Sequence, residues 1–545
     1  MPPQRRFDLP GERDRGRRTS RIEGGSNEKT PGNVHYRADV LAALAIPVRL
    51  AAQEQAPNAQ PPRYRLIDIG TFGGPASYFN NEDDGTFSVA LVNSQGTATG
   101  WADTAAPDPF PSFCFGDCYV SHAFQWRNGV RTDLGALSAG VSSDAIWISG
   151  SGLIAGDSQN GEIDPLVPGL PEIHAVLWKN GSIVDLGTLP EGGYESVASA
   201  VNSGGQVVGF ALNTIPDPYS LAGVTQTRAF VWQDGVMQDL GTLGSGTDAL
   251  AQFINEQGQV VGWSYTSSDP NTSCPSVSPL AIGSFIWDQE KGIQDLGTLG
   301  GTCTLATGIN NSGTVVGLYL NDNQIQRGFL WERGSIRDLG GSLGGDYASA
   351  EGINDEGLTA GSAFLAGNTT FHAALWRQVG EITDLGVLSG DQCSFASSIN
   401  AKAQIVGASI TDDCSFDNST RAFLWEGGSI FDLNTLIPAG SALHLQWARS
   451  INDLGEIAGA GFDAEGNLHD FLLIPCGEGD QACGDSALGA AASIQRKPAA
   501  LTQRGATAPR ANPALIGRPA TMLERLRSRW GQRYRLPGSV TGPTD

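Results

Sequence analysis

Short apolar runs alternate with polar turns along most of the chain. Seven of these runs end in Trp, at Trp126, Trp178, Trp232, Trp287, Trp331, Trp376 and Trp425. A polar turn such as Asn128-Gly129 or Asp234-Gly235 follows several of them. Asn-Gly and Asp-Gly between two apolar runs favour a tight β-hairpin. Each Trp run is therefore predicted to be a strand that pairs with the next run in the sequence.

Three further runs follow each Trp run in a fixed order. The second begins with Asp-Leu-Gly or a variant, at Asp68, Asp133, Asp185, Asp239, Asp295, Asp338, Asp384 and Asp432. The third ends in Asn, at Asn93, Asn202, Asn255, Asn310, Asn354, Asn400 and Asn452, with Ser149 in one unit. Gly lies three residues after nearly every Asn, and this spacing favours a type I turn capped by the Asn side chain. The fourth run resembles Val207-Val208-Gly209.

Four short strands per unit, at Trp spacings of 44 to 55 residues, are typical of a propeller blade. The first unit starts at Tyr64 without a Trp run, and the last run ends at Ile474, which takes the place of the Trp. We therefore predict an all-β, eight-bladed β-propeller of four-stranded antiparallel blades over residues 64–475. Three N-terminal strands plus one C-terminal strand are expected to close the ring in one sheet, because a shared sheet leaves no open edge.

The loop arrangement follows from taking the Trp strand as the innermost strand of each blade. The irregular segments 101–121, 157–173, 210–227 and 263–283 are then expected to cross between blades. They should share one face with the loops that follow Asp-Leu-Gly. Eight cysteines support disulfide bonds, and the predicted pairs are Cys114–Cys118, Cys274–Cys303, Cys393–Cys414 and Cys476–Cys483.

The charge is distributed unevenly. Residues 1–52 carry 10 Lys/Arg and 6 Asp/Glu, and residues 484–545 carry 10 and 3, which leaves 14 and 48 for residues 53–483, a net charge of −34. Such an acidic body repels nucleic acid, so no nucleic-acid partner is expected. Its charge either keeps the surface solvated or attracts cations and basic partners.

The two ends are predicted to lie outside the propeller. Residues 1–63 read as a basic lead-in with a secretory signal whose apolar part is residues 40–48, although Asp39 and Arg49 interrupt it. Translation is expected to start near Val34; the alternative is a disordered basic tail ahead of a short helix. Residues 476–545 form an Ala/Pro/Arg-rich tail, in which an amphipathic helix over 520–531 would contact an anionic surface or the acidic propeller. No apolar stretch is long enough for a transmembrane segment.

The candidate chemistry of the repeat favours structural roles. His122, His174 and His372 precede their Trp residues and do not make a closed set of metal ligands. The Asp of Asp-Leu-Gly recurs in every unit, as expected of a residue that binds backbone amides. The Gly-x-Ser-x-Gly pattern at 340–344 lacks the strand-to-helix context of a nucleophile. Acidic loops at 80–85, 412–413 and 463–467 leave Ca²⁺ as the one possible cofactor, but none has the spacing of a known calcium loop.

The Trp, Asp-Leu-Gly and Asn-x-x-Gly-x-Val-Val-Gly elements, with His122-Ala123-Phe124, resemble the HAF-repeat family of extracellular bacterial proteins. The resemblance covers about 410 residues and implies secretion without implying a reaction. No catalytic or metal-binding residue is predicted, and the ligand-binding residues are unknown. The expected function is a secreted, non-enzymatic propeller whose loop-rich face binds a glycan, a protein or a surface. The alternatives are a polysaccharide hydrolase or lyase and a structural surface component.

Overall fold

A computed structural model describes residues 61–477, except 80–88, 111–117, 167, 222–224, 271–279, 324, 412–413 and 415–418. These residues belong to one compact unit, Gln60–Asp545. The predicted secretory signal, the predicted helix over 520–531 and the acidic loops at 80–85 and 412–413 lie outside the described residues. No helix in the described ranges is long and apolar enough to span a membrane.

The described residues form short strands and one 3-10 helix, η1 (Leu433–Thr435). The first half contains β1 (Tyr64–Asp68), β2 (Gly73–Tyr78), β3 (Ala98–Pro107), β4 (Tyr119–Arg127), β5 (Val130–Asp133), β6 (Ser143–Ile148), β7 (Ile154–Ile163), β8 (Pro171–Lys179), β9 (Ser182–Asp185), β10 (Ser196–Val201), β11 (Val207–Pro216), β12 (Thr225–Gln233), β13 (Val236–Asp239), β14 (Ala249–Ile254), β15 (Val260–Tyr265) and β16 (Ile282–Asp288). The second half contains β17 (Gly292–Asp295), β18 (Cys303–Ile309), β19 (Val315–Leu320), β20 (Gln326–Glu332), β21 (Ser335–Asp338), β22 (Gly344–Ile353), β23 (Thr359–Leu365), β24 (Phe371–Gln378), β25 (Glu381–Gly386), β26 (Cys393–Ile399), β27 (Ile405–Ile410), β28 (Arg421–Glu426), β29 (Ser429–Asp432), β30 (His444–Ile451), β31 (Ile457–Phe462) and β32 (Leu468–Pro475).

The strands form successive groups of four, and neighbouring strands within a group are antiparallel. Six groups are separate four-stranded sheets, namely β2–β5, β6–β9, β10–β13, β22–β25, β26–β29 and β30–β32 with β1. The groups β14–β17 and β18–β21 share one eight-stranded sheet, in which a single parallel pair, Ile282 with Cys303, joins them.

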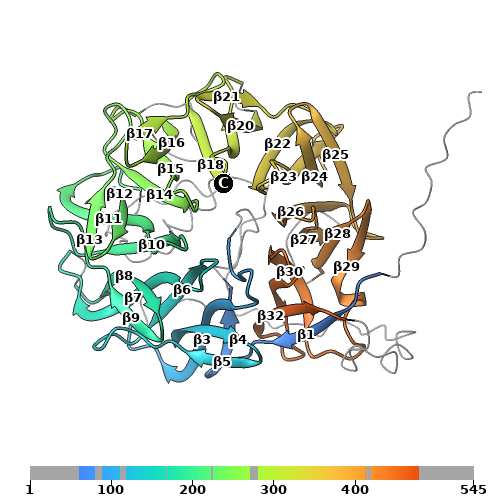
Figure 1. The fold of residues 1–545 in the computed structure, drawn as a ribbon, viewed down its shortest axis with the longest axis horizontal. Coiled ribbons are helices and arrows are strands. Elements are labelled where there is room, and N and C mark those ends of the chain that lie inside the picture. The colour runs from blue at the N-terminus through green and yellow to red at the C-terminus, as the bar shows by residue number, and fades with distance from the viewer. Residues whose placement is uncertain are drawn as a thin grey trace, which may run out of the picture. The chain divides into compact units, whose positions relative to one another are not determined.

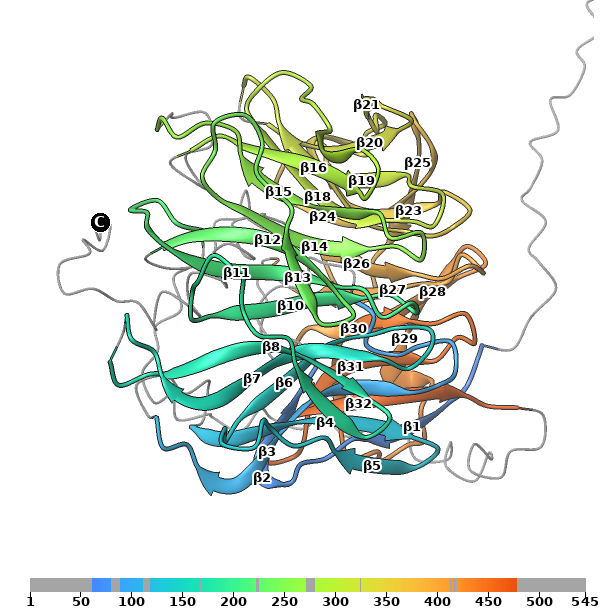
Figure 2. The same ribbon diagram turned by 60° about the vertical axis from the view of Figure 1, so that its left-hand side comes forward.

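The groups lie side by side around a central axis (Figure 1). Each group contacts the next one along the chain, and β2 contacts β32, so the contacts run around the whole ring. Figure 2 shows the same sheets edge-on, packed face against face. Their cores lie between sheets: one cluster joins Ala175 and Leu177 of β8 to Ala198 and Val201 of β10. This arrangement is a β-propeller.

The two ends of the described chain share one sheet, as predicted, but the division of strands between them is the reverse of the prediction. Strand β1 pairs with β32, with Ile67 opposite Leu472, and β31 and β30 complete the sheet. The closing sheet thus contains three C-terminal strands and one N-terminal strand. Leu473, not Ile474, takes the register position of the Trp, because Ile457 pairs with Leu473 as Val207 pairs with Trp232.

The prediction failed because the Trp strand is the third strand of each group, not the innermost. The innermost strand is the one that ends in Asn, as in the order β10-β11-β12-β13 with β10 nearest the axis (Figure 1). Facing sheets diverge with distance from the axis, so small residues fit the inner strands and bulky ones the outer strands. The inner strands show this small residue. A fully buried Ala lies four residues before Ser149 and before each repeat Asn except Asn93; these residues are Ala145, Ala198, Ala251, Ala306, Ala350, Ala396 and Ala448.

This strand order also corrects the assignment of the loops. The segments predicted as crossovers connect the second and third strands within a group, and β3, β7 and β11 continue into them. The crossovers to the next group instead follow Asp-Leu-Gly, as between Asp185 and Ser196. Connections alternate between the two ends of antiparallel strands, so the two loop classes still share one face, which we call the long-loop face.

A belt of asparagine side chains links the innermost strands. Each Asn Oδ1 accepts hydrogen bonds within its own turn, as from Gln257 N and Gln259 N to Asn255. Each Nδ2 donates to the backbone carbonyl at the equivalent position of the next group, as from Asn255 to Asn310 at 3.1 Å. The links run 93 to 149, 202 to 255, 255 to 310, 310 to 354, 354 to 400, 400 to 452 and finally 452 to 93 at 2.8 Å.

The belt changes where Ser149 replaces Asn. The Ser149 hydroxyl accepts from Leu153 N and so keeps the turn, but it is too short to reach the next group. Ser151 Oγ instead donates to Ser203 O at 3.2 Å.

Steric contact explains why the Val-Val-Gly element ends in Gly. At Gly262 an added Cβ would collide with the carbonyl oxygen of Leu250 on the inner strand, and Gly209 and Gly317 face the same kind of collision. The inner strand shifts register by one residue just beyond this point, between Ala251 and Phe253. The bulge brings the two backbones together, and glycine leaves room for them.

One predicted disulfide is confirmed. Cys393 and Cys414 are bonded across a separation of 21 residues and join a crossover end to the β27–β28 connection on the long-loop face. A loop of this size contributes about 3 kcal/mol in the chain-entropy model. Cys118, Cys303 and Cys476 are also disulfide-bonded. The partners predicted for them, Cys114, Cys274 and Cys483, lie outside the described residues.

We expect that Gly262→Ala lowers the free energy of unfolding by about 1–3 kcal/mol, because the methyl group would force the bulged strands apart. Gly328→Ala is the matched control: it meets only ordinary contacts, and Ala occupies the equivalent position in most units. Urea unfolding followed by Trp fluorescence measures both variants. Equal losses of stability would contradict the steric explanation.

The belt predicts opposite effects of two reciprocal changes. Asn255→Ser keeps the turn but removes the link to Asn310, so it should cost about 0.5–1.5 kcal/mol. Ser149→Asn should restore the missing link and raise stability by a similar amount. Thermal unfolding of both variants tests this. A stabilising Asn255→Ser, or a destabilising Ser149→Asn, would exclude the belt as a source of stability.

Candidate functional site

The repeated His and Asp residues identified in the sequence meet in pairs at the rim of the long-loop face. His122, His174 and His372 contact Asp133, Asp185 and Asp384, and His469 contacts Asp68. Arg228, Arg327 and Arg421 occupy the same position in other groups and bind Asp239, Asp338 and Asp432. The Asp also accepts from the Gly backbone N–H two residues later, as from Gly187 to Asp185 at 2.8 Å. These contacts fix the start of each crossover.

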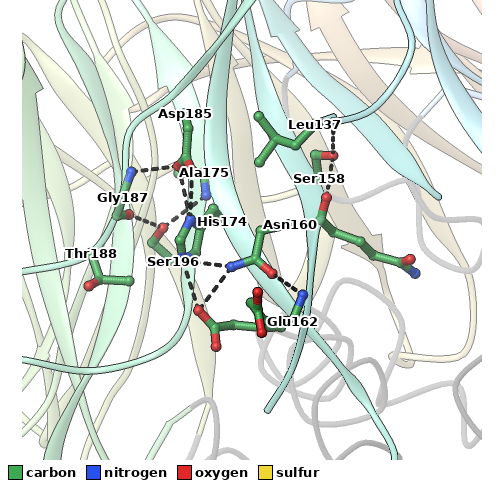
Figure 3. A network of polar contacts seen from close by, with 12 residues as sticks. Leu137, Ser158, Asn160, Glu162, His174, Ala175, Asp185, Gly187, Thr188 and Ser196 are labelled. Carbon is green, nitrogen blue, oxygen red and sulfur yellow. Dashed lines mark hydrogen bonds and ion pairs between the residues drawn. The ribbon is translucent and has the colours of Figure 1, made fainter. Parts of the chain in front are cut away.

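Figure 3 shows the network around His174. Its Nδ1 lies 2.9 Å from Asp185, and its Nε2 lies 3.1 Å from Glu172, which also accepts from Asn160. Burial lowers the pKa of His174, but the hydrogen bond and charge of Asp185 and the charge of Glu172 outweigh it and raise the pKa above 6.5. An imidazolium with both nitrogens bound to carboxylates is a poor general base, so this network serves the fold.

Two other sequence candidates have structural partners. In the loop at 463–467, Asp463 accepts hydrogen bonds from Glu465 N and Asn467 N and from the Asn467 side chain. Ser342, in the Gly-x-Ser-x-Gly pattern, donates to Gly345 O between β21 and β22. Among the described residues, no group of three His, Cys, Asp or Glu is placed to hold a metal ion.

The central channel opens, on the face opposite the long loops, into a cavity of about 380 Å³. The belt residues and their neighbours line it, and the charged side chains among the described lining residues are Glu256, Asp355 and Asp453. Each carboxylate accepts a backbone N–H from the preceding group, at 2.8–3.0 Å. The repeat itself builds this mouth, so its carboxylates extend the belt.

A second, smaller cavity departs from the repeat. It holds about 40 Å³ between the sheets β2–β5 and β6–β9 on the long-loop face. We call it the aspartate pocket, because its lining combines four carboxylates with three aromatic rings. The polar members are Asp103, Asp108, Asp144, Asp157, Gln159, Ser121, Ser142 and Ser143, and the others are Tyr78, Trp101, Tyr119 and Ile173.

The strands position the aromatic side chains of the pocket. Tyr78 on β2 and Trp101 on β3 are cross-strand partners, and their rings stack with centroids 5.8 Å apart. Both are buried, whereas Tyr119 on β4 is 37% exposed. A stacked pair with an exposed third ring is a common contact surface for sugar faces and cations.

One cross-strand pair of the pocket differs from its equivalents in the neighbouring sheets. Asp144 on β6 lies directly opposite Asp157 on β7. The same cross-strand position holds Val197 with Phe210 in the next sheet, and Leu250 with Trp263 or Leu305 with Leu318 further on. Those apolar pairs belong to one buried cluster. Like charges directly opposite each other destabilise a sheet, so this Asp pair is an energetic cost within the fold.

Two further features increase that cost. Gln159 takes the position that Leu212 and Leu320 fill with apolar side chains. Burial raises the pKa of Asp108, the negative charge of Asp144 raises it further, and the hydrogen bond from Phe110 N only partly offsets this. The equivalent pair in β22–β23, Ser349 with Ser362, is polar but uncharged. A charged cluster at a position where most other sheets carry apolar side chains is typical of a functional site.

Comparisons with known proteins do not identify the chain. No family model and no curated protein matches it. The solved structures similar to it include Pyrococcus horikoshii acylaminoacyl peptidase, at 10% identity and a TM-score of 0.36, where the match covers 59% of this chain and 50% of that one. The β-propeller domain of the Trilobed protease from Pyrococcus furiosus has 10% identity, a TM-score of 0.36 and coverages of 61% and 93%. Porphyromonas gingivalis dipeptidyl peptidase 4 has 8% identity and a TM-score of 0.42, and the match covers 71% of this chain and 59% of that one.

This chain therefore spans only about half the length of the Pyrococcus horikoshii peptidase.

The sequence patterns alone did not lead to the aspartate pocket. The signal was present, because Gly156 of the Val-Val-Gly element is followed by Asp157 where other units have Phe210, Trp263 or Leu318. The partner Asp144 lies 13 residues earlier and is opposite Asp157 only in the folded sheet. Tyr78 and Trp101 belong to a different unit, so their approach depends on the packing of two sheets.

His174 should stabilise the protein in a pH-dependent way. Because its pKa is raised on folding, its contribution is full below about pH 6.5 and is lost as the pH rises through the folded-state pKa. His174→Ala should therefore lower the urea midpoint clearly at about pH 5.5 and much less at about pH 9. Arg228→Ala is the matched control, since Arg stays charged; its effect should not change over this range. Parallel pH profiles for the two variants would contradict this assignment.

Restoring the repeat residues at the aspartate pocket should stabilise the fold. The double variant Asp144→Leu/Asp157→Leu replaces two facing carboxylates with the residues found at Leu305 and Leu318. We expect a gain of about 1–4 kcal/mol in the free energy of unfolding, because a buried polar cluster replaced by apolar residues often gains stability. Asp239→Leu, which removes the partner of Arg228, should instead lose stability. Chemical denaturation that shows a loss in the double variant would indicate a structural role.

Proposed function

We propose that this chain is a secreted, non-enzymatic binding propeller whose long-loop face takes a ligand in the aspartate pocket. The observation that carries the proposal is the replacement of an apolar junction by the facing pair Asp144 and Asp157. A fold retains such a destabilising cluster when another function requires it. The stacked rings of Tyr78 and Trp101 add a contact surface beside the carboxylates.

We also propose that the ring has eight blades. The eight-stranded sheet then counts as two blades, because only the pair Ile282 and Cys303 connects its halves. The belt supports the same count, with seven Asn positions and Ser149.

Export and family membership belong to the same proposal. The Cys393–Cys414 bond suits an oxidising compartment. The repeat elements fit the HAF-repeat family and its extracellular members.

A binding screen with the full chain tests the proposed function. The purified protein is offered to arrays of glycans, peptides and proteins, beside a broad polysaccharide hydrolase and lyase assay. Any ligand found should bind at least about tenfold more weakly to Asp157→Asn, since it would lose a buried, charge-assisted contact. Asp355→Asn, at the channel mouth on the opposite face, is the control and should bind normally. The proposal would be overturned by a ligand whose affinity is unchanged in Asp157→Asn. It would also be overturned by polysaccharide turnover that this variant abolishes.

A further inference from the structure

The lining of the aspartate pocket is acidic. Among the described residues that line it, four are Asp and none is Lys, Arg or His. An occupant that complements this charge carries positive charge and donates hydrogen bonds to the carboxylates.

Gln159 gives a second, independent indication. Its side chain lines the pocket and is only 5% exposed. Its Oε1 has no hydrogen-bond partner in the described part of the chain. A buried acceptor without a partner costs free energy, and a donor in the pocket would remove that cost.

The size and the aromatic lining of the pocket further restrict the chemical class of its occupant. A volume of about 40 Å³ is space for roughly three water molecules, which suits a guanidinium or ammonium head better than a hydroxylated sugar ring. The ring faces of Tyr78, Trp101 and Tyr119 attract cations. A bound metal ion fits less well, because no three acidic, His or Cys side chains among the described residues converge at metal-ligand distances.

Resting on the proposed function, we infer that the aspartate pocket binds a guanidinium or ammonium group carried by the basic side chain of a protein partner. Asp144 and Asp157 hold the cation, the Gln159 carbonyl accepts one of its hydrogen bonds, and the aromatic rings cover its apolar stem. The net charge of −34 over residues 53–483 attracts such a partner to the propeller.

The test compares an Arg-containing peptide with the same peptide containing citrulline, which has nearly the same shape but no charge. Calorimetric titration of the full chain should show binding of the Arg peptide and at least about tenfold weaker binding of the citrulline peptide. Arms with a Lys peptide and with free arginine and spermidine distinguish a protein-borne cation from a free amine.

Three variants assign the binding to the pocket. Asp157→Asn and Gln159→Leu should lower the affinity for the Arg peptide, whereas Gln159→Glu should raise this affinity by adding a negative charge. Asp355→Asn should leave its affinity unchanged.

The outcomes separate this inference from the proposed function. Equal binding of the Arg and citrulline peptides, or binding of free amines alone, would overturn the inference. Binding of a neutral oligosaccharide that Asp157→Asn weakens would also overturn it but leave the proposed function standing. If the pocket variants change the affinity of no probe and no array ligand, the inference and the proposed function both fail.

Discussion

The hydrogen bond from an Asn side chain to the carbonyl of the next sheet organises the whole ring. It joins groups that are 44 to 56 residues apart in the sequence, and its last member joins Asn452 to Asn93, 359 residues away. The same side chain closes its own turn through Oδ1, so one residue fixes both the inner hairpin and the spacing between sheets. Because the links are buried and near the axis, they have little access to water, and breaking one leaves a carbonyl or an amide unsatisfied.

The rest of the fold adapts to this inner belt. Small alanines and the glycine of Val-Val-Gly let the inner backbones approach, and seven of the inner strands carry a bulge next to this glycine. Further from the axis the space widens and is filled by the Trp strands, and the His–Asp and Arg–Asp pairs hold the crossovers at the rim. The long-loop face is therefore supported by a rigid frame, which is the usual setting for a binding surface.

Against this uniform frame, the proposed function rests on departures from the repeat. Ser149 weakens the belt between the sheets β6–β9 and β10–β13. The facing Asp144 and Asp157 replace the apolar pair found in the neighbouring sheet. The His residues first considered as metal ligands are the opposite case, because their recurrence with an Asp partner accounts for them structurally. A residue that recurs in many units serves the fold, whereas a costly residue present once requires another explanation.

The sequence by itself determined the strands, their hairpins, the Asn turns and the sharing of one sheet by the two ends, because these follow from local periodicity and turn chemistry. It also led to the Cys393–Cys414 bond. It did not determine which strand faces the axis, since the run of four strands reads the same whichever strand is taken as the first. That choice depends on the space between diverging sheets, which exists only in the tertiary structure. The aspartate pocket depends on it too, because Tyr78 and Trp101 come from one sheet and Asp144 and Asp157 from the next, and only packing brings them together.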